Sequence, residues 1–188
     1  MLALLQNLDI NILNFISNHF HNSILDKIMP VITILGNNGM IWIILSLPLL
    51  ISKKYRHVGF MAIGALLLSY LLGEGILKHL VQRSRPFVNL PAMDLLIAKP
   101  LSYSFPSGHT ASSFAAVGIL WREFKRYRIY MVTLAALIAF SRMYLYVHYP
   151  TDILGGILLG LACSWIVFRV YETRVRKTLQ DRRTHSVQ

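Results

Sequence analysis

The sequence predicts an all-α integral membrane protein: a six-helix bundle with an N-terminal amphipathic helix at the membrane surface. Hydrophobic residues make up 55% of the 188 residues and charged residues only 14%, whereas soluble domains carry about a quarter charged residues. Long apolar runs alternate with short clusters of Lys and Arg, the pattern of a multi-pass protein whose basic loops stay in the cytoplasm. The net charge of +11 therefore reflects membrane topology, and we expect no nucleic-acid partner.

Residues 1–22 are expected to form the interfacial helix. Apolar positions recur there at roughly helical spacing, with Gln, Asn and Asp between them, so one face suits lipid and the other water. These apolar positions are Leu4, Leu5, Leu8, Ile12, Phe15 and Ile16.

Six apolar segments follow and are predicted to be the membrane helices. They are 24–35, 40–52, 59–77, 108–121, 129–146 and 153–168. The turn at 36–39 separates the first two, which are both shorter than the ~20 residues that a bilayer requires, so their boundaries stay open.

The basic clusters orient the predicted bundle in the plasma membrane. Placing both termini in the cytoplasm puts the clusters at 53–56 and 122–128 and the basic tail at 170–188 inside. The section 78–107 and the turn near His148 then face the extracytoplasmic side. We expect one membrane-embedded domain over 1–188, with the lone Cys163 excluding a disulfide framework.

A polar stretch precedes the fourth predicted helix. Pro106 disfavours helix before it, Ser107 suits the N-cap, and Gly108 allows close approach to the backbone. A helix start exposes unpaired N–H groups and the positive end of the dipole, which favours an anion beside His109. Taken alone, the stretch could equally be an ordinary capped helix with an incidental histidine.

A basic cluster ends the third predicted helix. Lys78 supplies a point charge and Arg85 a planar fork, both suited to phosphate oxygens. Glu74 lies four residues before Lys78 and could hold it through an i,i+4 ion pair. The alternative for this cluster is an interfacial patch that binds lipid headgroups.

The third cluster joins the last two predicted helices. His148 and Asp152 are four residues apart, so the carboxylate can accept a hydrogen bond from one imidazole nitrogen and leave the other free as a nucleophile or base. Arg142 adds a cation. A lone His–Asp pair of this kind is commonly structural.

The three clusters share one predicted membrane face, where ionisable groups are costly without a task. Cations and N–H groups can neutralise a phosphate while one histidine attacks and the other protonates the leaving group. A zinc site built from His109, His148 and Asp152 is the competing hypothesis. Nearby cations would repel a metal ion, so we expect neither a metal nor another cofactor.

The motifs resemble the three-part signature of the type 2 phosphatidic acid phosphatase superfamily. In order they are Lys78 with six residues before Arg85-Pro86, then Pro106-Ser107-Gly108-His109, then Ser141-Arg142 with five residues before His148 and three more before Asp152. No signature position departs from the pattern.

The resemblance implies a role for each matching position. His148 would form a phosphohistidine, Asp152 would orient it, and His109 would act as general acid. The phosphate would be bound by Lys78, Arg85, Ser107, Gly108 and Arg142.

The expected partners are the bilayer and a lipid phosphate substrate. Undecaprenyl pyrophosphate is preferred over phosphatidylglycerol phosphate and phosphatidic acid because Arg83 and Lys99 supply further cations on the outer side. The alternative for each of these two residues is an interfacial anchor. A lipid-binding or lipid-translocating protein that uses the pocket without chemistry is the alternative from another class. The segment 87–103 could be a lid or a connector.

Overall fold

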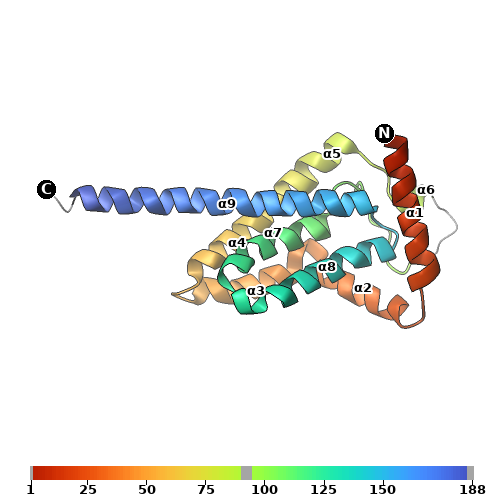
Figure 1. Ribbon diagram of the computed structural model, residues 1–188, viewed down its shortest axis with the longest axis horizontal. Coiled ribbons are helices and arrows are strands. Elements are labelled where there is room, and N and C mark those ends of the chain that lie inside the picture. Colours follow the sequence, from red (N-terminus) through yellow and green to blue (C-terminus); the bar gives the residue numbers. More distant parts are fainter. Residues whose placement is uncertain (1, 90–94, 186–188) are drawn as a thin grey trace.

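The computed structural model describes residues 2–89 and 95–185, and every regular element in them is helical (Figure 1). In chain order the elements are α1 (Leu2–Phe20), α2 (Leu25–Leu35), the 3-10 turn η1 (Asn37–Gly39), α3 (Met40–Ile51), α4 (Arg56–Tyr70), the π-helical turn η2 (Leu71–Leu77), α5 (Lys78–Val81), α6 (Pro86–Asn89), α7 (Gly108–Glu123), the 3-10 turn η3 (Lys125–Tyr127), α8 (Arg128–Tyr144) and α9 (Pro150–His185). The all-α prediction is confirmed.

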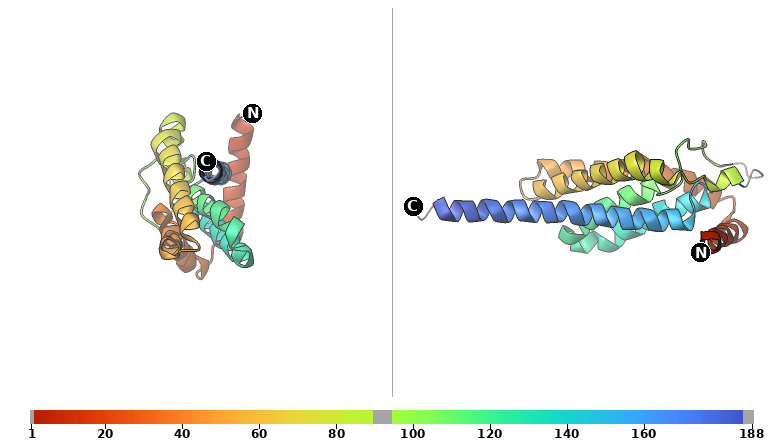
Figure 2. Two further views of the ribbon diagram at one scale, coloured as in Figure 1. Left: turned by 90° about the vertical axis from the view of Figure 1, so that its left-hand side faces the viewer. Right: turned by 90° about the horizontal axis from the view of Figure 1, so that it is seen from above.

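The helices form an elongated bundle with one helix lying across its end. α1 crosses the end at which α7 and α9 begin, and α9 runs along the bundle and beyond its other end (Figure 1). The turned views show the same arrangement, with α1 at one end and the C-terminal part of α9 projecting from the other (Figure 2). The N-terminal helix and the end of α9 therefore lie at opposite ends of the molecule.

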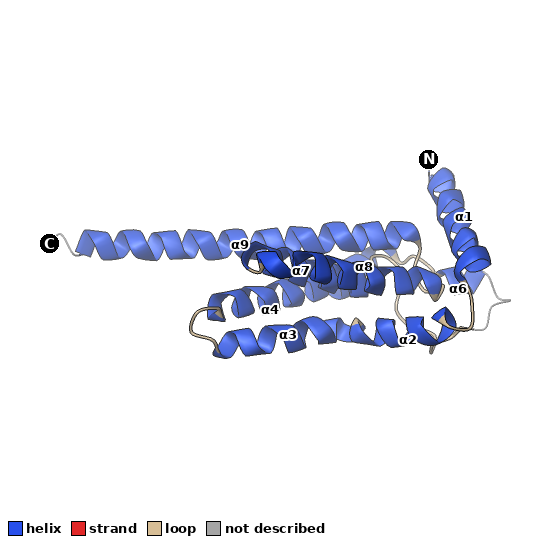
Figure 3. Ribbon diagram, turned by 60° about the horizontal axis from the view of Figure 1, so that its bottom comes forward, coloured by secondary structure: helices blue, strands red, loops and turns tan. Residues whose placement is uncertain are grey.

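The first two predicted membrane helices do not run antiparallel. α2 and α3 follow each other nearly end to end (Figure 3), with a bend of 48° at η1. Asn38 and Gly39 adopt left-handed backbone conformations with φ of 50° and 70°. This break interrupts the helix and redirects it without reversing the chain, so the predicted turn at 36–39 is a bend inside one rod.

The six-helix membrane bundle is not confirmed. In the part of the chain that the structure describes, two helical stretches are long and apolar enough to cross a bilayer, Arg56–Val88 and Pro150–Val175, and α2 with α3 would make a third. α7 and α8 have 16 and 17 residues, at or below the lower limit for a spanning helix. α7 packs against α4, α8 and α9, whereas α8 exposes Ile129, Tyr130 and Leu137.

The ends of the chain differ in detail from the prediction. The predicted tail from residue 170 begins inside α9, which continues to His185, and residues 186–188 lie outside the described part. Between α1 and α2, Asn22 accepts from the N–H groups of Ile24 and Leu25 at 3.1 and 3.0 Å, because its carboxamide reaches the first turn of α2 as an N-cap side chain does.

α7 is the centre of the fold. Its buried face carries the small residues Ala111, Ala115 and Ala116, so α9 and α4 can pack closely against it. Trp42 on α3 is fully buried and donates its indole N–H to the Ser113 hydroxyl at 2.9 Å. This hydrogen bond satisfies a polar group that would be costly to bury unpaired and fixes α3 against α7.

Candidate active site

A cavity of about 280 Å³ opens between the helices near the end covered by α1. Its lining joins the bend in α2–α3, the α4–η2–α5 rod, the start of α7 and the α8–α9 connection. The lining residues are Asn38, Gly39, Leu66, Ser69, Tyr70, Glu74, Lys78, Arg85, Pro100, Ser102, Gly108, His109, Ser112, Arg142 and His148. Six of the eight predicted site residues are in this set, all but Ser107 and Asp152, together with Glu74.

Lys78 reaches the cavity from a helix that widens just before it. The seven-residue π-helical turn η2 ends at Leu77, and such turns often occur at functional sites. Lys78 is buried, with its ammonium 2.7 Å from the Glu74 carboxylate and 2.9 Å from the Ser102 hydroxyl. The predicted Glu74–Lys78 pair is confirmed, and it holds the cation at the cavity wall.

Arg85 is fixed by backbone oxygens. Its Nε and Nη1 atoms donate to the carbonyls of Ser102 and Val147, both at 2.7 Å. Its Nη1 also lies 3.2 Å from Nε2 of His148. Because a guanidinium can only donate, Nε2 of His148 accepts and carries a lone pair on the cavity side, which is what a nucleophilic nitrogen requires.

The other imidazole nitrogen of His148 faces Asp152. Nδ1 is 3.5 Å from Asp152 Oδ2 and has no hydrogen-bond partner among the described residues. This distance is beyond a good hydrogen bond, and catalytic contacts of this kind often shorten when substrate binds. His148 lies in the loop between α8 and α9, and burial lowers its pKa to about 3. The imidazole is therefore neutral at physiological pH.

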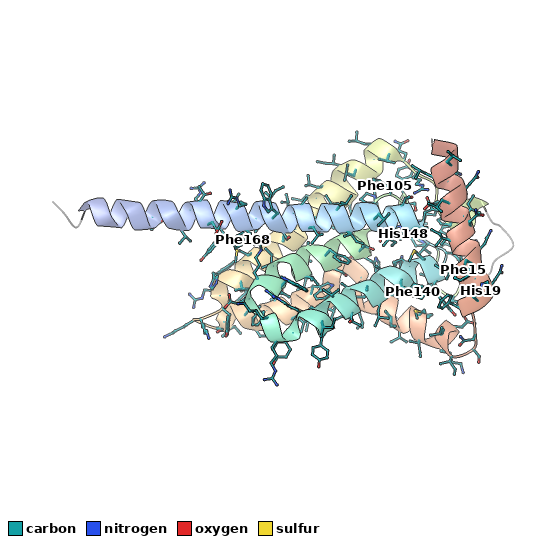
Figure 4. The ribbon with its side chains drawn as sticks, viewed as in Figure 1. Phe15, His19, Phe105, Phe140, His148 and Phe168 are labelled. Carbon is teal, nitrogen blue, oxygen red and sulfur yellow. The ribbon has the colours of Figure 1, made fainter. Side chains whose placement is uncertain are left out.

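Asp152 is held on both oxygens. Oδ2 accepts from the Ser104 hydroxyl and from the N–H of Tyr149 at 2.8 Å, and Oδ1 is 2.6 Å from Arg83 Nη1. Asp152 is fully buried behind His148 (labelled in Figure 4) and does not line the cavity. It can act on a ligand only through the histidine.

The start of α7 brings a second histidine to the cavity. Ser107 is the N-cap, as predicted, and accepts from the N–H of Thr110 at 3.4 Å. Gly108 lies so close to Glu74 that a Cβ atom would be 2.6 Å from its Oε1. The Nε2 of His109 is 2.9 Å from the Asn37 amide oxygen, so the bend in α2–α3 positions this imidazole.

Arg142 completes the cationic wall. Its Nη1 donates to the Thr33 hydroxyl, while its Nε has no partner among the described residues. It is buried, and a buried donor without a partner is costly. Lys78, Arg85 and Arg142 outnumber the single lining carboxylate, Glu74, so an anion in the cavity would offset their repulsion and satisfy the free donor.

Two hypotheses from the sequence find no support. Arg83 does not line the cavity, because it pairs with two buried carboxylates, and Lys99 is exposed on the connecting segment. Neither is an additional phosphate cation at the cavity. In the residues that the structure describes, no group of three His, Cys, Asp or Glu side chains could hold a metal ion, so the zinc hypothesis has no geometric basis.

Several contributors were missed because no motif marks them. Ser102, Ser104 and Asn37 are ordinary polar residues in the sequence, and each reaches the site only through the fold. The segment 87–103, for which the sequence leaves open a lid or a connector, lies partly outside the described residues, which exclude 90–94. Its described end supplies Pro100 and Ser102 to the cavity wall.

A cation-lined cavity holding two histidines in a helical membrane bundle defines a class of phosphate-handling membrane enzymes. Comparison with known proteins agrees: the PAP2 superfamily model matches residues 58–176, a range that contains all eight predicted site residues. The chain belongs to the PAP2 superfamily.

Similar proteins extend the match over most of the chain. An undecaprenyl-diphosphatase of Sulfolobus acidocaldarius is 34% identical over 165 residues, covering 87% of this chain and 78% of the relative. The crystal structure of LpxE from Aquifex aeolicus has a TM-score of 0.75 at 30% identity, covering 86% of this chain and 95% of that one. A PAP2-type phosphatidylglycerolphosphate phosphatase from Bacillus subtilis has a TM-score of 0.72 at 26% identity, covering 89% and 86%.

Proposed function

We propose that this protein is a membrane lipid phosphatase that removes the terminal phosphate of a lipid phosphate or diphosphate, with undecaprenyl pyrophosphate as its substrate. The observation that carries the proposal is the shared cavity of Lys78, Arg85, Arg142, His109 and His148. Membership of the PAP2 superfamily supports the reaction type. Phosphatidylglycerol phosphate and phosphatidic acid are the alternative substrates.

The preference for undecaprenyl pyrophosphate is supported by a homologous protein and by the polarity of the cavity, and no longer by Arg83 and Lys99. The Sulfolobus acidocaldarius relative is an undecaprenyl-diphosphatase, and the cavity extends from the cations to the apolar Leu66 and to Tyr70 on α4. A phosphate at the cations and a prenyl chain toward α4 would match this change in polarity.

The reaction would proceed in two steps. His148 Nε2 attacks the terminal phosphorus, the bond from phosphorus to the bridging oxygen breaks, and His109 gives its proton to the leaving lipid phosphate. Water then attacks the phosphohistidine, His109 takes its proton, the P–N bond breaks, and inorganic phosphate leaves. Asp152 orients His148 and stabilises the positive charge on its ring. The cations and the N–H groups beginning at Gly108 stabilise the charge on the transferred phosphoryl group.

Purified protein in liposomes should release phosphate from undecaprenyl pyrophosphate faster than from the other two lipids, and excess chelator should leave the rate unchanged. Binding of all three lipids without phosphate release would instead support a lipid-binding or translocating protein. Loss of activity in chelator, restored by zinc, would support the metal-dependent alternative.

We propose a single membrane-embedded domain over 1–188 with a revised topology. The α2–α3 rod, the α4–α5 rod, α7, α8 and α9 cross the membrane, which is an odd number, and α1 lies on the outer surface. The basic clusters at 53–56 and 122–128 lie at the end toward which α9 projects (Figure 1), as expected of a cytoplasmic face. The site then faces the extracytoplasmic side, with the C-terminus inside and the N-terminus outside.

The exposed face of α1 supports its place at the membrane surface. Leu4, Leu8 and Phe15 are more than half exposed, while the opposite face packs on the bundle. An apolar stripe on a helix lying across the bundle end suits the lipid interface.

Cysteine labelling should distinguish the two topologies. In a Cys163→Ala background, Gln6→Cys on the exposed side of α1 should react with an impermeant thiol reagent on intact cells. Arg126→Cys at the opposite end should react only after the cells are permeabilised. Labelling of Gln6→Cys only from the cytoplasm would restore the original prediction that both termini lie inside.

A further inference from the structure

A buried carboxylate on the N-terminal helix contacts the active-site end of α9. Asp9 is 1% exposed. Its Oδ1 accepts from the N–H of Thr151 at 2.9 Å, and its Oδ2 accepts from the Thr151 hydroxyl at 2.5 Å. Asp9 therefore satisfies an N–H group in the first turn of α9, next to Asp152.

Arg83 connects this carboxylate to Asp152. Its Nη2 is 2.6 Å from Asp9 Oδ2, and its Nη1 is 2.6 Å from Asp152 Oδ1. The guanidinium also lies over the Tyr149 ring, 4.0 Å from its centroid. One planar fork thus bridges two buried carboxylates from α1 and α9, a geometry that a lysine cannot reproduce.

The charges of Asp9 and Arg83 favour an electrostatic role at the active site in addition to holding α1 in place. Without Asp9, the Arg83 guanidinium would offset the charge of Asp152 and weaken its attraction for a positively charged His148 ring. With Asp9 present, two carboxylates share one guanidinium, so the cluster keeps a net negative charge beside His148. Arg83 also fixes Oδ1 of Asp152, which leaves Oδ2 as the oxygen that faces His148 Nδ1.

We infer that Asp9 and Arg83 are positioning residues, which orient the Asp152 carboxylate and keep its negative charge available to His148. The N-terminal helix α1 then contributes a positioning residue, Asp9, to the active site. This inference rests on the proposed phosphatase function.

The α1 helix has other anchors, which make the inference testable by single substitutions. The Tyr146 hydroxyl donates to the Leu13 carbonyl at 2.9 Å, and Leu13 and Ile16 are buried. Asp9→Asn keeps the size of the side chain and an oxygen acceptor while removing the charge. We therefore expect α1 to remain docked in this variant, with an unchanged thermal unfolding profile in detergent.

Asp9→Asn should lower kcat roughly 10- to 100-fold, as expected for an outer partner of an orienting group, with KM within about threefold of the wild type. Glu123→Gln, which removes an exposed carboxylate at the other end of α7, should change neither constant. A wild-type kcat in Asp9→Asn, or a raised KM with unchanged kcat, would overturn the inference.

Arg83→Lys provides a second test, which also applies if Asp9→Asn fails to fold. It should lower kcat similarly, and Asp9→Asn combined with Arg83→Lys should be no slower than the worse single variant, because both act through Asp152. The inference would be contradicted if the fold-decrease in kcat of the double variant equalled the product of the two single decreases, or if Arg83→Lys kept the wild-type kcat. If the wild type releases phosphate and His148→Ala is inactive while these variants are fully active, only the inference fails. If the wild type itself releases no phosphate, the proposed function fails.

Discussion

His148→Ala should abolish phosphate release. The nucleophilic nitrogen would be lost while Lys78, Arg85 and Arg142 remain, so the variant should still bind the lipid with little change in affinity. We expect kcat to fall by roughly four to six orders of magnitude, the scale seen when a nucleophile is removed from a covalent mechanism. Phosphate release with a sensitive dye, and lipid binding measured separately, would check both parts.

His79→Ala is the matched control, because His79 is exposed at the same end of the bundle and does not line the cavity. It should keep the wild-type rate. A His148→Ala variant that folds normally and retains substantial turnover would show that water attacks the phosphorus directly or that another residue is the nucleophile.

Gly160→Ala should separate the two helices that carry the site. A Cβ atom at position 160 would lie 2.4 Å from the carbonyl oxygen of Ala111 and 2.8 Å from the backbone nitrogen of Ala115. Backbone atoms cannot move aside as a flexible side chain can, so α9 must shift away from α7. His109 lies on α7 and Asp152 on α9, so the shift would disturb the relation between them.

The expected cost of this overpacking is about 1–3 kcal/mol of folding free energy. A displacement of about 1 Å at the site can lower the rate roughly 100-fold, so kcat should fall as well. Thermal unfolding in detergent and the phosphate-release assay would measure the two effects.

Gly64→Ala is the control for this substitution. Its added Cβ atom would meet only a side-chain carbon of Val167, at an ordinary 3.6 Å. We expect unchanged or slightly higher stability, since alanine favours the helix. Equal effects at the two glycines would contradict the close α7–α9 contact.

The sequence predicted the parts of the site that are encoded locally. Ser107 as an N-cap and the Glu74–Lys78 pair depend on residues three or four positions apart, and both are found. The chemistry of the three clusters also pointed to one phosphate pocket, because ionisable groups gathered at one membrane face are costly without a task. The fold then brings Lys78, Arg85, His109, Arg142 and His148 to the same cavity.

The long-range partners could not be predicted. Asp9 and Arg83 are 74 residues apart, and Asp9 and Thr151 are 142 apart, so no local pattern connects them. The sequence suggests Arg83 as a further cation for the substrate phosphate, because its charge is visible in the sequence and its carboxylate partners are not. A buried ion pair between distant helices has no signature in one sequence.

The bend between α2 and α3 misled the prediction for a different reason. Gly36-Asn37-Asn38-Gly39 has the composition of a reversing turn, but its two left-handed residues bend the helix by only 48°. In the topology that we propose, the two short apolar segments make one crossing rather than two. This difference changes an even number of crossings to an odd one and moves the expected position of the N-terminus across the membrane.

The central claim is that His148 carries the phosphoryl group during the reaction. The most direct test mixes the enzyme with undecaprenyl pyrophosphate, stops the reaction rapidly at alkaline pH to preserve a P–N bond, and locates the phosphoryl group by mass spectrometry. We predict one phosphoryl group on His148 in the wild type and none in His148→Ala. A phosphoryl group on another residue, or rapid turnover without any on His148, would contradict the mechanism.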